Sequence, residues 1–326
     1  MSPAKSSSSL GASGASRAGV TVPAHLGNQP LDALVRALYR VSWNEARDRI
    51  RTGKLSVNGA VRTEPLFRVR AGAELLLSMR APRPRADLLP DEAVVFVDAH
   101  VVVVDKPAGI STVPYDARET GTLDERVRLW LGRQGRRERD SKGVRPPLGI
   151  VHRLDKETSG LVVFTRSWLG KKSLSSQFRA HTVRRRYLAI AHGDIRSRTL
   201  RSRLVPNRGD GLRGSHKGRP THREDGQLAI THVEALERLE GATLVACVLE
   251  TGRTHQIRIH LSEAGHPLVG ERVYVRGYSG SVVPAPRLML HARELGFVHP
   301  KTGEDVLWTR EPPADFEETL RRLARR

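Results

Sequence analysis

The segment 149–164 places charged side chains directly beside an apolar run, and this sets the strongest constraint on how the chain can fold. His152, Arg153 and Asp155 come first, and the apolar run 161–164 follows. Ionised groups next to a buried strand are costly unless they pair with one another or face water in a cleft. The segment therefore indicates either a structural ion-pair cluster or a functional cleft, and composition alone favours the ion pairs.

Beyond residue 90 the chain alternates between β-branched runs and helical patterns. Residues 94–97 and 101–104 predict a hairpin, and 161–165 predict a strand followed by a helix that Ser167 caps. The other predicted elements are strands at 187–191, 231–238 and 243–249 and a helix over 254–264, ending at Gly265. We therefore expect a large domain of alternating strands and helices.

The chain is strongly basic, with 55 Lys and Arg against 35 Asp and Glu and a formal net charge of +20. Such an excess favours a polyanionic partner, because each neutralised phosphate releases a counterion. Arginine supplies most of it, which suits phosphate contacts but also follows from genomic base composition. No apolar run reaches the ~18–20 residues that cross a bilayer. We expect a cytoplasmic protein that binds nucleic acid and no membrane.

Two basic stretches have little periodicity and are expected to be loops. Residues 133–145 predict an exposed loop. Residues 196–226 carry nine Lys and Arg against three acidic residues. We interpret the second stretch as a mobile loop or insertion on the RNA-facing side, although a merely solvated loop fits nearly as well.

The N-terminal part of the sequence contains a tail and a small domain. Residues 1–28 lack acidic side chains and are rich in Ser, Ala and Gly, which indicates a disordered tail. Helical spacing begins at Leu31, and Ser42 with Glu45 three residues later forms a capping box for a second helix. Strands are predicted before the Asn-Gly turn at residue 58 and over 69–77.

Two basic helices followed by a small sheet resemble an S4 RNA-binding domain, most closely in the run Gly-Lys-Leu-Ser-Val-Asn-Gly at 53–59. The resemblance implies a small α/β RNA-binding domain over residues 29–80. Its expected RNA-binding residues are Arg47, Arg51 and Lys54. Residues 81–89, with prolines and charges of mixed sign, predict a linker to a domain over 90–326.

The segment His-Arg-Leu-Asp-Lys-Glu-Thr-Ser-Gly-Leu-Val-Val-Phe, from His152 onwards, resembles the signature of the RluA family of pseudouridine synthases. The resemblance implies that Asp155 is the catalytic carboxylate. It also implies that Arg153 enters the RNA stack where the target base leaves, and that His152 lies beside the RNA.

Three further segments resemble motifs of the same family. The run Lys-Pro-Ala-Gly from Lys106 resembles an early motif with a structural or RNA-facing role. The run around Tyr187 resembles the segment with the active-site tyrosine. The run Thr-Gly-Arg-Thr-His-Gln-Ile-Arg, 251–258, resembles the late motif, in which Arg258 pairs with the catalytic carboxylate; Arg253 and His255 are expected to bind RNA. Glu271 stands where Asp is more usual and is not expected to do chemistry.

These residue types fit the isomerisation of uridine. Burial alone would favour the neutral form of Asp155, so a permanently charged guanidinium from Arg258 is needed to keep it ionised. Tyr187 offers a face on which the flipped uracil can stack, worth ~1–3 kcal/mol. Arg153 would offset part of the cost of flipping. The ionised carboxylate could attack C1′ of the ribose or C6 of the base, or remove the 2′ proton.

Other functions remain open at this point. A metal hydrolase is disfavoured because His255 and His260 are five residues apart, a poor pair on a helix, and no His-Glu-x-x-His occurs. A glycoside-type hydrolase needs a second carboxylate, and Glu157 is poorly spaced for that role. A non-catalytic, ribosome-associated RNA-binding protein is permitted by the charge, but Asp155 would then weaken phosphate binding without purpose.

Together the motifs predict an α+β catalytic domain with a central mixed, mainly antiparallel sheet, preceded by the small S4-like domain. The expected function is to isomerise uridines in structured RNA, with large-subunit ribosomal RNA favoured over transfer RNA by analogy with similarly built enzymes. Because the reaction is redox-neutral, we expect no organic cofactor, and because the histidines are poorly spaced we expect no metal. We also expect a monomer. Cys247, the single cysteine, excludes an intramolecular disulfide and is expected to be buried.

Overall fold

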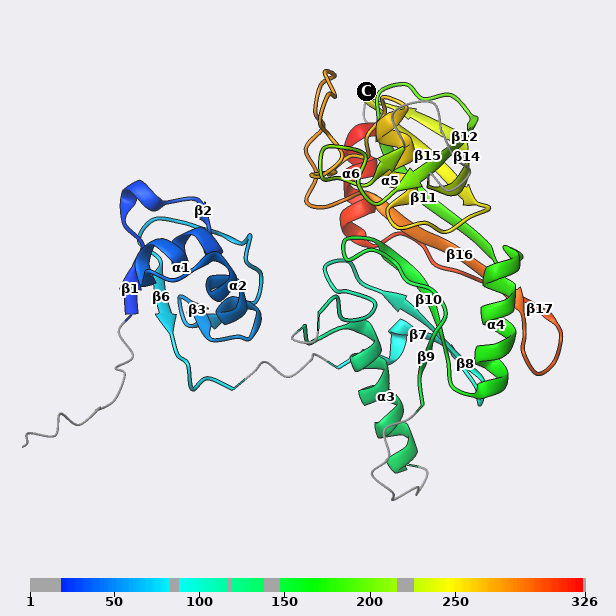
Figure 1. Cartoon of the computed structure of the whole chain (residues 1–326), viewed down its shortest axis with the longest axis horizontal. Helices are drawn as coiled ribbons and strands as arrows, with labels where there is room; N and C mark the ends of the chain where they lie inside the picture. The colour runs from blue at the N-terminus through cyan, green and yellow to red at the C-terminus, as the bar shows by residue number, and fades with distance from the viewer. Residues whose placement is uncertain (1–18, 83–87, 117–118, 138–146, 216–225, 325–326) are drawn as a thin grey trace, which may run out of the picture. The chain divides into compact units, whose positions relative to one another are not determined.

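The computed structural model describes residues 19–82, 88–116, 119–137, 147–215 and 226–324. The chain divides into two compact units, residues 1–86 with 116–120, and residues 87–115 with 121–326. Each unit has its own hydrophobic core, and each is described by itself (Figure 1).

The N-terminal unit packs two short helices against a small sheet. Its elements are β1 (Gly19–Thr21), a 3-10 turn (Ala24–Leu26), β2 (Gln29–Pro30), α1 (Leu31–Tyr39), α2 (Trp43–Arg51), β3 (Leu55–Val57), β4 (Ala60–Val61), β5 (Arg68–Val69) and β6 (Glu74–Leu77). The sheet has the order β1-β6-β3-β4. The predicted capping box is present, because the Ser42 side chain accepts a hydrogen bond from the backbone N–H of Glu45 at 3.2 Å.

Residues 19–28, which were predicted to belong to the tail, are part of this unit. Strand β1 pairs antiparallel with β6, and Val22 is 1 % exposed within the core of the unit. Three residues of strand carry too little pattern to be found without the partner strand. Residues 1–18 lie outside the described residues. The strand predicted over 69–77 is interrupted by a turn at Gly72 and forms β5 and β6.

The second unit is built on one large sheet. Its elements are a 3-10 turn (Asp91–Ala93), β7 (Val94–Val97), β8 (Val101–Lys106), α3 (Leu123–Arg137), β9 (Gly149–Ile150), β10 (Ser159–Thr165), α4 (Trp168–Ala180), β11 (Arg184–His192), β12 (Arg198–Val205), β13 (Gly214–Ser215), β14 (Gln227–Leu239), β15 (Ala242–Leu249), α5 (Gln256–Glu263), β16 (Leu290–Val298), β17 (Asp305–Thr309) and α6 (Ala314–Ala324).

The order of its strands is β13-β12-β14-β15-β11-β16-β10-β8-β7, with β17 on β16 and β9 on β10. Only β10 and β16 pair in parallel among the described strands; the other pairs are antiparallel. The expected α+β fold with a mixed, mainly antiparallel sheet is confirmed. Helices α3 and α5 pack on one face of the sheet, while α4 and α6 cover parts of the other.

Two predicted loops contain regular structure. Helix α3 extends to Arg137, into the stretch 133–145, and residues 138–146 lie outside the described residues. The stretch 196–226 contains β12 and β13, and residues 216–225 are not described. Strand β12 was missed because its arginines lie on an exposed face and hide the apolar alternation. The predicted helix 254–264 begins two residues later, at Gln256.

Candidate active site

Asp155 lies in the loop between β9 and β10, and hydrogen bonds fix this loop on both sides of the carboxylate. The Thr112 hydroxyl donates to the carbonyl of Leu154 at 2.9 Å and accepts from its N–H at 3.0 Å. The N–H of Gly109 donates to the carbonyl of Lys156 at 2.8 Å. Because neighbours on both sides are held, the position of Asp155 is set by residues 106–112.

A close approach of two strands anchors the end of the same loop. Gly160 has φ +108°, and a Cβ there would lie 2.3 Å from the carbonyl oxygen of Ala292. Only glycine accommodates this approach between β10 and β16. The chain therefore enters β10 at a fixed point, five residues after Asp155.

Lys106 is fully buried, so the prediction that it contacts RNA is wrong. Its Nζ donates to the carbonyl oxygens of Pro107 and Lys156 at 3.0 Å and of Ile110 at 2.8 Å. Burial lowers the pKa of Lys106 to about 7, although the charges of Glu157 and Asp155 act in the opposite direction. The three carbonyl contacts use all the donors of an ammonium group, so Lys106 holds the two loops together.

Arg258 connects Asp155 to a second carboxylate that sequence reasoning set aside. Its Nη1 lies 3.4 Å from Oδ2 of Asp155, while Nε and Nη2 bind Glu271 at 2.7 and 2.8 Å. Burial disfavours the charged guanidinium, but the hydrogen bonds and charges of Glu271 and Asp155 raise the pKa of Arg258. The sequence signal for this role was only the position of Glu271 in a matching motif.

His255 lies on the other side of Asp155, at the N-cap of α5. Its Nε2 is 3.8 Å from Oδ1 of Asp155, and its Nδ1 hydrogen-bonds the hydroxyl of Tyr274 at 2.7 Å. Burial lowers the pKa of His255, and the charge of Asp155 offsets part of this shift. The guanidinium of Arg258 lies 5.2 Å from the centroid of the Tyr274 ring. Tyr274 thus contacts both of the side chains, His255 and Arg258, that lie beside the Asp155 carboxylate.

Tyr187 faces the same pocket from β11. The register of β11 against β16 shifts between Arg186 and Tyr187, and a bulge of this kind re-aims a side chain beside a site. Tyr187 is 8 % exposed, and its burial raises the pKa of the phenol. The pocket has a volume of about 470 Å³, which is in the range of small-ligand sites. It is large enough for one extruded nucleotide.

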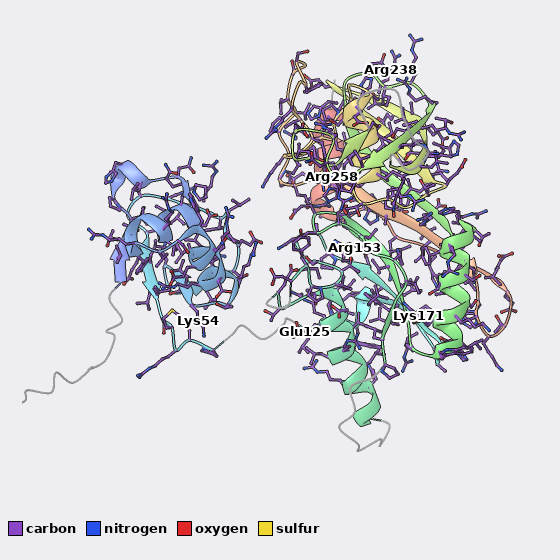
Figure 2. All side chains as sticks on the ribbon, viewed as in Figure 1. Lys54, Glu125, Arg153, Lys171, Arg238 and Arg258 are labelled. Carbon is purple, nitrogen blue, oxygen red and sulfur yellow. The ribbon has the colours of Figure 1, made fainter. Side chains whose placement is uncertain are left out.

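The other predicted RNA-binding residues of this unit take different places around the pocket. Arg153 is exposed (Figure 2), and Arg253 lies at the wall with its Nε donating to the Leu228 carbonyl at 3.0 Å. His152 also lines the pocket, but its Nε2 accepts from the N–H of Val163 at 3.0 Å and its ring stacks on Phe178. Burial lowers the pKa of His152 to about 3, so the ring is neutral and forms part of the pocket wall.

Arg185, two residues before Tyr187, was not expected to belong to the site, yet it is a buried cation in the pocket lining. It is 7 % exposed, and its Nη2 makes long contacts of 3.4 Å to the carbonyls of Leu249 and Glu250. Its Nε has no hydrogen-bond partner in the described part of the chain. Burial lowers the pKa of Arg185. Because Arg185 lines the pocket, its guanidinium can bind an anionic group of a ligand.

Three of the basic residues that were predicted to bind RNA lie on the N-terminal unit. The side chain of Arg47 pairs with Asp32 at 2.9 Å and remains 44 % exposed. Arg51 is exposed on the same helix, and the Nζ of Lys54 donates to the carbonyl of Ala81. Helix α2 therefore presents two cations to solvent, while Lys54, in the turn between α2 and β3, is hydrogen-bonded to the chain itself.

Comparisons with known proteins identify the family. A family model described as RNA pseudouridylate synthase matches residues 100–263, and an S4 domain model matches residues 29–75. The ribosomal large subunit pseudouridine synthase D of Pseudomonas aeruginosa is 35% identical over 308 residues, covering 90% of this chain and 92% of the relative. The chain belongs to the RNA pseudouridylate synthase family.

Other members agree with this assignment. The protein of the same description from Zymomonas mobilis is 33% identical over 293 residues, covering 87% of this chain and 90% of its own. The human RNA pseudouridylate synthase domain containing 1 has a TM-score of 0.54 at 25% identity, covering 68% of this chain and 83% of its own. The resemblance stated from the motifs is confirmed, and the chain is an isomerase that acts on RNA.

The described residues contain neither a candidate metal site nor a candidate membrane-spanning helix. No group of three or more His, Cys, Asp or Glu side chains in the described ranges could hold a metal ion. Likewise, no helix of those ranges is long and apolar enough to cross a membrane.

Proposed function

We propose that Asp155 is the catalytic carboxylate and that it acts with Arg258 and Tyr187. The observation that carries the proposal is the meeting of these three side chains in one pocket, with the Arg258 guanidinium 3.4 Å from the carboxylate. An ionised Asp155 can attack C1′ of the ribose or C6 of the base, or remove the 2′ proton. In each case Arg258 stabilises the ionised form of the carboxylate.

The surrounding residues bind and orient the RNA in this proposal. Tyr187 supplies a face for the flipped uracil, and Arg153 fills the gap that the base leaves in the stack. Arg253 and His255 contact the RNA backbone at the pocket wall, and His152 supports that wall. Lys106 positions the loop of Asp155 and does not touch RNA.

We infer that the natural substrate is large-subunit ribosomal RNA. The relatives from Pseudomonas aeruginosa and Zymomonas mobilis carry that substrate in their names, and they cover both units of this chain. The S4 domain, with Arg47, Arg51 and Lys54, holds structured RNA through its backbone phosphates, and the residues from 90 onwards modify it. The protein acts in the cytoplasm, as a monomer, without a cofactor.

Chemical mapping of pseudouridine tests the substrate and the catalytic residue together. Ribosomal RNA is compared between cells with the wild-type gene, a deletion, and the Asp155→Asn allele, with Asp305→Asn on the exposed strand β17 as the matched control. We expect the same site or sites to be lost in the deletion and in Asp155→Asn and kept in the control. Purified Asp155→Asn protein should bind RNA as the wild type does.

Other outcomes separate the alternatives. Unchanged ribosomal RNA with pseudouridine lost from transfer RNA would assign the enzyme to transfer RNA. Retention of full activity by Asp155→Asn would contradict the catalytic role of Asp155. Unchanged pseudouridine in both kinds of RNA would favour a non-catalytic RNA-binding role for this chain.

A further inference from the structure

The outer face of α4 carries a stripe of aromatic and basic side chains that begins at the pocket lining with Arg179 and extends beyond it. Trp168 is 73 % exposed, and the Nζ of Lys172 lies 5.0 Å from the centroid of its ring. Lys172, Ser175 and Arg179 follow the tryptophan by four, seven and eleven residues, so all four side chains lie on one face of the helix. None of the thirteen residues of α4 is acidic.

The opposite side of α4 packs against the sheet, so the stripe faces solvent. Leu174 is fully buried with Val163 and Leu295, in the core between α4 and the sheet. A Cβ at Gly170 would lie 2.4 Å from the carbonyl oxygen of His100, so the helix cannot rotate about this contact. Figure 1 shows α4 along the outside of its unit, and Figure 2 shows Lys171 on the same helix.

The stripe is continuous with the pocket. Phe178 and Arg179, in the last turn of α4, line the pocket, as does His181 at the C-cap. At 1.5 Å per residue, Trp168 lies about 16 Å from Arg179 along the helix axis. That length matches roughly five nucleotides of a stacked strand at ~3.4 Å each. A strand that leaves the pocket past Arg179 can therefore reach Trp168.

We propose that this face of α4 binds the RNA strand that flanks the target uridine, with a base on Trp168 and a phosphate on Lys172. The proposal rests on the proposed function only in that RNA enters the pocket. An exposed indole does not stabilise the fold by burial, but it supplies a flat face on which any base can stack. Lys172 and Arg179 supply the positive charge that draws a phosphate backbone. An apolar protein surface would bury the indole but leave these charges without a partner, whereas an RNA strand uses both features.

The test uses the full chain with Trp168→Ala and Lys172→Ala combined, and an unmodified transcript of large-subunit ribosomal RNA as the probe. We expect the Kd at fixed KCl to rise about 10-fold or more. The plot of log K against log salt should become shallower by about 0.7 to 0.9, the value for one lost phosphate contact. The single-turnover rate at saturating enzyme should stay unchanged. Trp168→Phe should recover most of the stacking contribution.

A matched control removes equal exposure and charge elsewhere in the same unit. Val282 is 74 % exposed and Arg321 is exposed on α6, so Val282→Ala with Arg321→Ala should leave the Kd and the salt slope near the wild-type values. A Kd and slope for the α4 variant that match this control would overturn the proposal and point to a protein contact on α4.

Binding needs no turnover, so the comparison decides the role of α4 even when the transcript is not modified. If the wild-type enzyme formed no pseudouridine in this transcript, the proposed substrate would fail. A difference in Kd and salt slope between the α4 variant and the control would still support the RNA-binding face.

Discussion

Glu271 binds Arg258 through two hydrogen bonds, from Nε to Oε2 at 2.7 Å and from Nη2 to Oε1 at 2.8 Å. Nη1 is the remaining nitrogen, and it lies 3.4 Å from Asp155. Because the guanidinium is planar, fixing two of its nitrogens also fixes the direction of the third. The side chain of Glu271 is fully buried, so this pair directs Arg258 towards the carboxylate of Asp155.

Replacing Glu271 by glutamine should therefore reduce both stability and rate. Loss of one partner of a buried pair costs about 3 kcal/mol in the free energy of unfolding. We expect the single-turnover rate to fall at least about 10-fold, because misdirection of Arg258 weakens its hold on Asp155. Urea unfolding and single-turnover assays on RNA measure the two effects.

Glu311 provides a matched control for this substitution. It is 65% exposed and pairs with Arg293 at 2.6 Å. Surface pairs contribute about 0–1 kcal/mol, so Glu311→Gln should change little. A Glu271→Gln enzyme with wild-type rate and normal RNA affinity would show that Arg258 keeps its aim without Glu271.

Replacing Lys106 by methionine should destabilise the protein without changing its electrostatic contact with RNA. Three carbonyl oxygens lose their donor, and each buried group left unsatisfied costs ~1–3 kcal/mol. We expect a lower Tm, a reduced rate, and a salt slope of RNA binding equal to that of the wild type. A shallower salt slope for the variant would instead show that Lys106 contacts an RNA phosphate.

The exposed Arg153→Ala variant should keep its Tm and lose rate.

Local chemistry in the sequence predicted several elements of the fold correctly. The Ser42 and Glu45 capping box and the hairpin of β7 and β8 depend on neighbours within a few residues, so their signals lie in short windows. Strand β1 and strand β12 were missed because each is defined by a distant partner, β6 or β14. In β12, outward arginines also hide the periodicity.

The candidate site was predicted only in part, because some of its contacts also join residues that are distant in the sequence. Family motifs brought Asp155, Tyr187 and Arg258 to attention, and the structure gathers all three around one pocket. The binding of Glu271 to Arg258 and the burial of Lys106 arise from contacts across 13 and 50 residues of chain. Such contacts exist only once the sheet has formed, and no local pattern encodes them.

Two buried histidines make the stability of the fold depend on pH. Burial lowers the pKa values of His260 and His291 to about 4 from an ordinary 6.5. As the pH falls below 6.5, the unfolded chain takes up protons that the native state refuses until about pH 4. The free energy of unfolding therefore decreases with falling pH in this window, by up to about 1.4 kcal/mol per pH unit for each histidine.

Urea unfolding at pH 7.5, 6 and 5 measures this dependence. His291→Gln should give a shallower slope, because the share of one histidine is removed, although Ser159 and the Arg310 carbonyl then lose their usual partner. His25→Gln is the control, since His25 lies in a short exposed turn of the N-terminal unit. Equal slopes for the wild type and His291→Gln would mean that the pKa of His291 is the same in the native and unfolded states.

The N-terminal unit should supply RNA affinity but not chemistry. Replacing Arg47, Arg51 and Lys54 by alanine removes three cations from the S4 domain, and none of them lines the pocket of Asp155. Each lost phosphate contact makes the salt slope shallower by ~0.7–0.9, so we expect a total change of up to about 2 to 3 and a higher Kd. The single-turnover rate at saturating enzyme should remain that of the wild type. A rate that falls while Kd stays constant would place the S4 domain in the chemical step, and deletion of residues 1–80 should then abolish activity rather than weaken binding.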